Sequence, residues 1–344
     1  MSSPDKPAER QSGIRLPGAI WVVVAALVSY VIFWFVMAEQ FRDAVRDWAE
    51  EGDRLRATYS GMVLSGFPFV VRLTVGDVVL ARPGSWAWRG PLVVLEARPW
   101  SPWRVRVRAP GEFELDLPGA GGPAAWKGVA RELSAEVTFE GGRIRDGRIR
   151  ISGLDMTGAA GRLAVASGAF RLRVLGGVDA DHLTASADLR VEAKDVEAPG
   201  ELPLGGHLGR IVLTARVMGG IGRGPEALAQ WRDKGGTVEV TDLAVDYGPL
   251  DMRASGTVAL DGAMQPVGAF TARIRGFFQT VDALKDRGLI RARDAITAKV
   301  VLGVLARNPG DGGPPVLNLA VTVQDRKVYV GPVVLAEIPE IHWP

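Results

Sequence analysis

The sequence predicts a mainly β protein in which one N-terminal transmembrane helix precedes an extended antiparallel sheet with a few short helices. Three observations support this fold class. An uncharged apolar run lies near the N-terminus, aliphatic and arginine residues alternate along many later segments, and 43 glycines and 22 prolines punctuate the 344 residues. Because glycine and proline favour turns, their number is typical of a chain with many strands joined by turns.

The apolar run extends from Leu16 to Ala38 and lies between the charged residues Arg15 and Glu39. As a helix its central part, Gly18–Met37, would span about 30 Å, the thickness of the hydrocarbon core of a bilayer. We therefore predict a transmembrane helix over residues 16–38, preceded by a disordered tail over residues 1–15. Two alternatives are a signal peptide cleaved after Ala38, although such segments usually have about 7–15 apolar residues, and a buried core helix.

Residues 39–59 predict an amphipathic juxtamembrane helix, because apolar or small residues recur there at helical spacing. These residues are Phe41, Val45, Trp48, Gly52, Leu55 and Tyr59. Their stripe would pack on the following domain, lie at the membrane surface or form a short coiled coil. Basic residues flank the anchor on both sides, so they do not orient it. The short tail before the helix favours a large C-terminal domain on the non-cytoplasmic side.

Residues 60–344 predict a β-rich domain, because apolar and charged residues alternate with period two. In the segment Arg104–Arg108 and in residues 148–151 and 170–174, this alternation places arginines on one face and aliphatic side chains on the other. Further strands are expected at Ile211–Val217, Thr237–Val245, Met252–Leu260, Phe270–Ile274, Ala298–Leu305, Leu317–Val323 and Val328–Leu335. The proline- and glycine-rich stretch Ala198–Gly209 is a candidate boundary between two halves, 60–200 and 201–344.

Two short helices are expected within this domain, at Pro225–Lys234 and Gln279–Arg287, each followed by glycine. The chain shows no regular alternation of strands and helices. A parallel, doubly wound sheet is therefore not expected.

Several classes of chemistry find little support in the sequence. The chain has no cysteine and three histidines that lie far apart, so no metal site or cysteine nucleophile is expected. Gly219–Gly224 lies where a phosphate-binding loop could sit, but Pro225 breaks the glycine pattern, and an ordinary connection is favoured. Asp179, Asp181 and His182 are interpreted as a solvated turn. We expect no catalytic residues, no enzyme activity and no cofactor, and the net charge of +2 gives no indication of nucleic-acid binding.

The segment Arg82–Arg108 is unusually rich in arginine and tryptophan and contains one acid, Glu96. Arginine and tryptophan together suit an interface with anionic lipid headgroups. The tryptophan ring prefers partly apolar surroundings, such as the boundary between membrane and water, and the arginine guanidinium binds phosphate. The candidate interface residues are Trp86, Trp88, Arg89, Trp100, Trp103 and Arg104. In the alternative interpretation the tryptophans fill the core and the arginines face water.

Three stretches resemble the bacterial envelope family known as domain of unknown function 2125 (DUF2125). They are Ser65-Gly66-Phe67-Pro68-Phe69 with the following Arg72-Leu73, the proline- and tryptophan-rich segment Ala97–Trp103, and Gln324–Pro332 leading to Ile338-Pro339. The third departs from the family pattern at Arg326, where glycine is usual. Residues Tyr247–Leu289 are also similar to AsmA-type proteins, with a strand pair closed by Asp261-Gly262, a further strand and a short helix.

The resemblance implies a curved, AsmA-like sheet, held in the periplasm by a single helix in the bacterial inner membrane. It also implies a non-enzymatic role in envelope maintenance, in which a hydrophobic groove binds or passes phospholipid or another envelope lipid. The alternative is a structural or assembly factor that binds other envelope proteins through strand edges or through residues 39–59. Its sheet would bury the apolar face internally and leave no groove.

Overall fold

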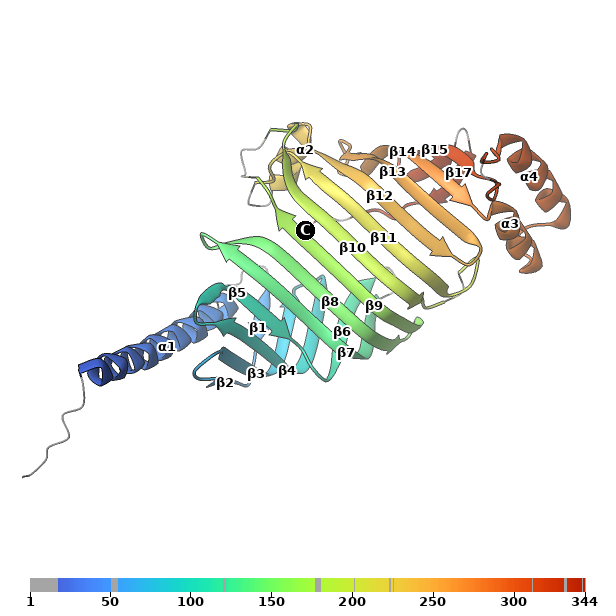
Figure 1. Ribbon diagram of the computed structural model, residues 1–344. Coiled ribbons are helices and arrows are strands. Elements are labelled where there is room, and N and C mark those ends of the chain that lie inside the picture. The colour runs from blue at the N-terminus through green and yellow to red at the C-terminus, as the bar shows by residue number, and fades with distance from the viewer. Residues whose placement is uncertain are drawn as a thin grey trace, which may run out of the picture.

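The computed structural model describes residues 18–50, 55–119, 122–176, 181–200, 202–222, 224, 226–310, 312–330, 333–341 and 343. Figure 1 shows one long helix, α1, that projects from one end of a large curved sheet, and a pair of helices at the other end. The mainly β fold class and the antiparallel sheet are confirmed. The disordered tail expected over residues 1–15 lies outside the described residues.

Helix α1 (Gly18–Glu50) combines the predicted transmembrane helix with most of the juxtamembrane helix. By length and composition it can cross a membrane, with a mean hydropathy of 2.5 over its most apolar window. Only 11% of that window is buried inside the protein, whereas a core helix of a soluble protein would be mostly buried.

The predicted helix over 39–59 is wrong at its C-terminal end, because Arg56–Thr58 form strand β1. Gly52 lowers the helix propensity of this region. The backbone of β1 instead pairs with β3, where Arg56, Ala57 and Thr58 lie opposite Ala81, Leu80 and Val79. Over Arg56–Thr58, pairing with a neighbouring strand therefore replaces the expected helix.

All strand pairs are antiparallel, and strands that follow one another in the sequence are mostly neighbours in the sheet. The strands after β1 are β2 (Gly61–Ser65), β3 (Val71–Arg82), β4 (Trp86–Arg98), β5 (Ser101–Arg108), β6 (Glu112–Gly119), β7 (Gly122–Glu140), β8 (Arg143–Gly158), β9 (Gly161–Val174), β10 (Ala185–Glu197), β11 (His207–Met218), β12 (Thr237–Tyr247), β13 (Leu250–Leu260), β14 (Pro266–Arg275), β15 (Leu317–Gln324), β16 (Lys327–Val330) and β17 (Val333–Glu337).

Two positions in the sheet are each shared by two short strands. Strands β1 and β2 both pair with β3, and β5 and β6 both lie between β4 and β7. From β7 onward each strand pairs with the next one in sequence. The candidate boundary Ala198–Gly209 does not interrupt the sheet, because β10 and β11 on its two sides pair directly.

Helices α2 (Ala227–Asp233) and α3 (Phe277–Asp286) lie where short helices were expected. The strand expected at Ala298–Leu305 is wrong, since these residues belong to α4 (Ala292–Leu305). Their β-branched side chains favour a strand locally, but this segment forms a helical pair with α3, in which Lys299 Nζ lies 2.6 Å from Asp282. No strand pairs with it among the described residues, so tertiary context outweighs local propensity.

Candidate functional site

The inner face of the sheet is apolar from one end to the other. In the register of the ladders, neighbouring strands place aliphatic, aromatic, alanine or glycine residues opposite one another in long rows. One row crosses thirteen strands, from β3 to β16: Val71, Ala97, Val105, Val137, Gly147, Leu172, Leu189, Ala215, Val240, Gly256, Phe270, Val321 and Val330.

A parallel row crosses twelve strands, again without a polar residue: Leu73, Leu95, Val107, Ala135, Ile149, Phe170, Val191, Leu213, Leu243, Ala254, Ala272 and Leu319. We call these two rows the apolar floor. With strands about 4.8 Å apart, the longer row extends for about 58 Å along the sheet. The length of the floor is therefore about four times the thickness of the hydrocarbon layer of one leaflet, which is half of the hydrocarbon core.

At its N-terminal end the floor is covered by α1, and between them lies an apolar groove of about 600 Å³, here called the anchor groove. Its helical wall consists of Phe41, Ala44, Val45, Trp48 and Ala49. Its sheet wall consists of Ala57, Tyr59, Met62, Val75, Val78, Leu80, Val93, Leu95, Pro102, Val105, Val107, Val137, Phe139 and Ile144. All of these side chains are hydrophobic except for the hydroxyl of Tyr59, so the groove suits a hydrocarbon ligand.

The part of the predicted stripe that lies on α1, namely Phe41, Val45 and Trp48, thus faces the sheet and lines the anchor groove, while Gly52 lies outside the described residues. Phe41 and Val45 pack on the buried residues Leu73 and Val75 of β3, while Trp48 remains 54% exposed. The spacing of the stripe correctly indicated one apolar face. It did not identify β3–β8 as the partner, because helical spacing carries no information about tertiary neighbours.

Burial changes along the floor. The three clusters of buried side chains found among the described residues, with the partly buried side chains packed on them, belong to α1 and β2–β9 and to the connections between these strands. Further along, the small or β-branched floor residues Ala215, Val240 and Ala272 are still buried, whereas the larger Phe170, Leu213 and Leu243 are only half-buried. Glycine allows one close contact there, because a Cβ on Gly256 would lie 2.6 Å from the ring of Phe270. The distal floor is therefore an apolar surface that the described part of the chain leaves partly open.

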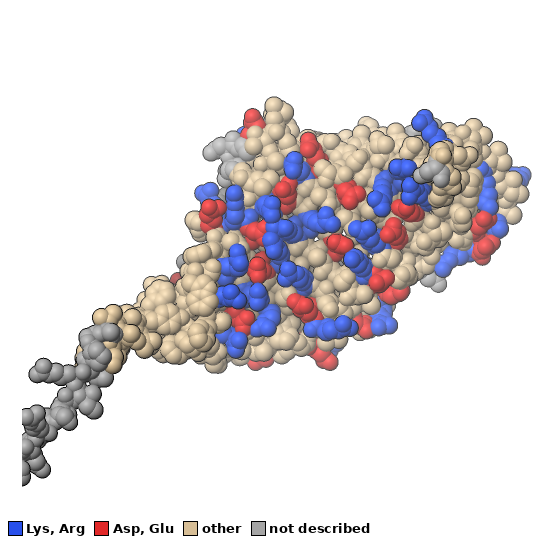
Figure 2. Space-filling view, viewed as in Figure 1, with Lys and Arg blue, Asp and Glu red and all other residues tan. Residues whose placement is uncertain are grey.

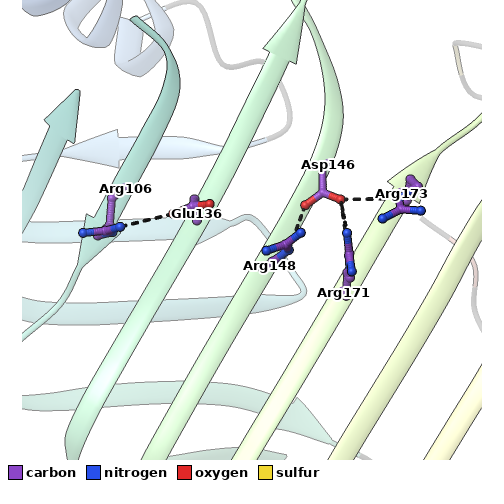
Figure 3. Close-up of polar contacts among 6 residues, drawn as sticks. All are labelled: Arg106, Glu136, Asp146, Arg148, Arg171 and Arg173. Atoms are coloured by element: carbon purple, nitrogen blue, oxygen red, sulfur yellow. Dashed lines mark hydrogen bonds and ion pairs between the residues drawn. The ribbon is translucent and has the colours of Figure 1, made fainter. Parts of the chain in front are cut away.

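The outer face carries the charges that alternate with the floor residues, and Figure 2 shows them spread over the sheet. Asp146 on β8 lies at the centre of an arginine cluster, 3.1 Å from Arg148, 3.0 Å from Arg171 and 3.7 Å from Arg173 (Figure 3). Partial burial raises the pKa of Asp146, but the Arg171 hydrogen bond and the three positive charges outweigh it, so the pKa lies below its usual value.

A second acid on this face is held in the same way. Glu96 on β4 accepts hydrogen bonds from Arg72 and Arg108, both at 2.7 Å. Its partial burial raises the pKa, while the hydrogen bonds and charges of these two arginines bring the pKa below its usual value. Arg106 and Glu136 pair beside it at 3.3 Å. Acidic residues of the sheet thus neutralise many of the outer arginines. We interpret this charged outer face as a surface in contact with water.

The structure separates the six predicted interface residues into two groups at opposite ends of β4. Trp88 packs on Phe113 with ring centroids 6.3 Å apart and belongs to the apolar clusters. Arg89 pairs with Asp116 at 2.5 Å on the outer face. Trp86, half-buried, begins the same strand. For this group the core-and-solvent interpretation fits the observed packing.

The other group lies where β4 turns into β5. Trp100 and Trp103 are 56% and 51% exposed. Trp100 and Arg104 line one small depression. Trp103 precedes Arg104 on β5. This group lies near the end of the sheet from which α1 projects, since Ala97 of β4 packs in one cluster with Trp34 of α1.

The other motifs that the sequence singled out have structural explanations. At the start of the Gly219–Gly224 stretch, Trp231 Nε1 donates to the Met218 carbonyl, and Gly219 has a φ of +83°, which favours glycine. Asp181 accepts hydrogen bonds from the Leu183 amide and the Thr184 hydroxyl, which forms a turn, while Asp179 lies outside the described residues. Within the described ranges, no group of three histidine or acidic residues is placed to bind a metal ion.

A family model described as an uncharacterized protein conserved in bacteria (DUF2125) matches residues 34–339. The match begins near the end of the apolar part of α1 and extends through β17. Comparisons with curated proteins and with solved structures give no significant match.

Proposed function

The chain belongs to the DUF2125 family, and we propose that it is a non-enzymatic envelope protein that binds or passes lipid acyl chains along its apolar floor. In this proposal α1 anchors the protein in the bacterial inner membrane and the sheet lies in the periplasm. The observation that carries the proposal is the floor itself, which runs without a polar residue from the helix-covered end of the sheet to β16.

The packing of α1 supports a retained anchor over a cleaved signal peptide. Trp34, Met37 and Ala38 are buried in one cluster with Val71 and Ala97 of the sheet. Cleavage after Ala38 would remove the helical half of this cluster and expose Val71, which is fully buried. The loss of such contacts is costly, since burying one large aliphatic side chain contributes about 1.5–3 kcal/mol.

The dimensions of the site support acyl chains as its ligand. An anchor groove of about 600 Å³ lies within the range of small-molecule pockets, which is about 300–1,000 Å³. Each methylene removed from water contributes about 0.8 kcal/mol. Ten methylenes in the groove would therefore contribute about 8 kcal/mol before the cost of ordering the chain is subtracted.

Photo-crosslinking in cells tests the proposal, because adjacent residues on one strand face opposite sides. The photoreactive residue p-benzoylphenylalanine would replace Leu213 or Leu319 on the floor, and Thr214 or Ala320 on the outer face as matched controls. We expect phospholipid adducts at the two floor positions and few at the two controls. Equal lipid adducts on both faces, or none on the floor, would contradict the proposal.

A second candidate is an assembly factor that binds other envelope proteins. It is favoured by β17, which pairs only with β16 among the described strands and so leaves a sheet edge that a partner strand could extend. The same experiment distinguishes the two functions. Protein adducts without lipid adducts at Leu213 and Leu319 would favour the assembly factor.

A further inference from the structure

The loop between β2 and β3 contacts α1 inside the apolar part of the helix. The Tyr30 hydroxyl donates a hydrogen bond to the Pro68 carbonyl at 2.5 Å. The rings of Trp34 and Phe67 meet edge to face at 5.4 Å, and Phe35 stacks on Phe67 at 6.2 Å. A loop of the sheet domain therefore lies beside residues that belong to the uncharged run of the anchor.

The length of the anchor determines where this loop lies relative to the bilayer. Tyr30 precedes the first charged residue, Glu39, by nine positions, which is about 13 Å along a helix. If the helix left the hydrocarbon at Tyr30, the uncharged residues before it, Leu16–Ser29, would span only about 21 Å as a helix. Since the hydrocarbon core is about 30 Å thick, Tyr30 and the loop beside it lie within it or at its boundary.

The exposed side chains at this end of the sheet fit such a position. Phe67 and Phe69 of the loop are 49% and 68% exposed. Trp100 of the β4–β5 turn and Trp103 near the start of β5 are more than half exposed, and residues 99–103 are together called the turn 99–103. The loop and the turn are neighbours, because Val70 and Trp100 line the same depression. Four large exposed aromatic side chains on adjacent connections are unusual on a surface facing water and typical of a membrane interface.

Part of the polar backbone of the loop is paired within the protein, which lowers the cost of placing these groups away from water. Pro68 has no N–H group, and its carbonyl accepts the Tyr30 hydrogen bond. The Val70 amide donates to the Gly66 carbonyl at 3.0 Å. This turn requires glycine, because Gly66 has a φ of +97° and a Cβ there would lie 2.4 Å from the Val70 carbonyl oxygen.

We propose that the loop 66–70 and the turn 99–103 insert into the leaflet next to the sheet domain, among the acyl chains of its phospholipids. This inference rests on the proposed anchoring by α1. Pro102 of the inserted turn lines the anchor groove, together with Phe139 and Ile144 at the adjoining strand ends. The mouth of the groove then opens against acyl chains, and a lipid tail enters it without crossing water.

Spin labels on single cysteines test the insertion, and the absence of native cysteine leaves no background labelling. The full chain would carry Phe69→Cys or Trp100→Cys in vesicles of phosphatidylethanolamine and phosphatidylglycerol. Val63→Cys serves as the aqueous control, because Val63 lies on β2 near the loop and is 65% exposed. Val23→Cys, 57% exposed on α1, serves as the membrane control.

We expect labels at Phe69 and Trp100 to collide several-fold less with a water-soluble nickel complex than the label at Val63, and more with oxygen. Val23 should behave like the two loop positions. Nickel accessibility at Phe69 and Trp100 equal to that at Val63, with Val23 protected, would overturn the insertion and leave the anchor intact. Accessible labels at Val23 as well would overturn the anchor and the insertion together.

Discussion

Replacing Ile144 by asparagine should weaken lipid binding in the anchor groove without unfolding the sheet. Ile144 lines the groove opposite Phe139 at the start of β8 and is 48% exposed. Fully burying an isoleucine contributes about 1.5–3 kcal/mol, so covering the exposed half of Ile144 with an acyl chain contributes about 1 kcal/mol. That contribution is lost when the side chain becomes an amide.

The amide adds a second penalty when lipid covers it. A buried amide without a hydrogen-bond partner costs about 1–3 kcal/mol. The sum is about 2–4 kcal/mol, and each 1.4 kcal/mol corresponds to a tenfold change in affinity. We therefore expect Ile144→Asn to weaken lipid binding roughly 30- to 700-fold.

Native mass spectrometry of the full chain, titrated with phospholipid in detergent, would measure the occupancy. Ile144→Leu keeps the groove apolar and should bind as the unaltered protein does. Arg143→Asn changes an exposed neighbour and should likewise leave occupancy unchanged. Occupancy that is equal in Ile144→Asn and Ile144→Leu, with both proteins folded by circular dichroism, would refute the assignment of the groove to acyl chains.

Four further outcomes concern stability, each measured by unfolding the full chain in detergent. Leu73→Ala should lower the free energy of unfolding by about 2–5 kcal/mol, because Leu73 is fully buried between α1 and the sheet. Asp146→Asn should destabilise by about 1 kcal/mol at neutral pH. Because folding lowers the pKa of Asp146, this difference should disappear as pH falls through the pKa of the folded state, and high salt should reduce it. Arg326→Gly should raise the free energy of unfolding by about 1 kcal/mol, because Arg326 has a φ of +59° that glycine adopts without strain. The loss of its exposed ion pair with Glu340 should reduce this gain. Removing lipid should lower the midpoint of unfolding, since a ligand at 100 times its Kd stabilises the folded state by about 2.7 kcal/mol; an unchanged midpoint would contradict bound lipid.

The sequence predicted those features that depend on local pattern. An uncharged run long enough to cross a bilayer indicated α1, and alternation such as Arg104–Arg108 indicated strands with one apolar face. The glycine that is usual at the position of Arg326 also has a local reason. Asp325 and Arg326 form the β15–β16 turn with φ values of 50° and 59°, where a glycine would carry no Cβ penalty.

Features that depend on strand register and tertiary contacts could not be predicted from the sequence. Alternation assigns Val105 to the apolar face, but only the fold places it in one groove with Trp48. The same limit explains the error at Ala298–Leu305, where β-branched residues indicated a strand and packing on α3 produced a helix. It also explains why six candidate interface residues, all close in sequence, divide between the two ends of one long strand, β4.

A sheet with one apolar face normally buries that face against a second layer of the same chain. Here α1 covers the floor at the N-terminal end, where the buried clusters lie, while distal residues such as Phe170 and Leu213 are half-buried. A closed sandwich, as expected for the assembly factor, would bury them fully. Partly exposed apolar rows of this length would promote aggregation in water unless something apolar covers them. In the proposed arrangement the end of the floor that α1 covers lies beside the bilayer, which would supply such a ligand in excess. This arrangement favours lipid over a protein partner as the occupant of the floor.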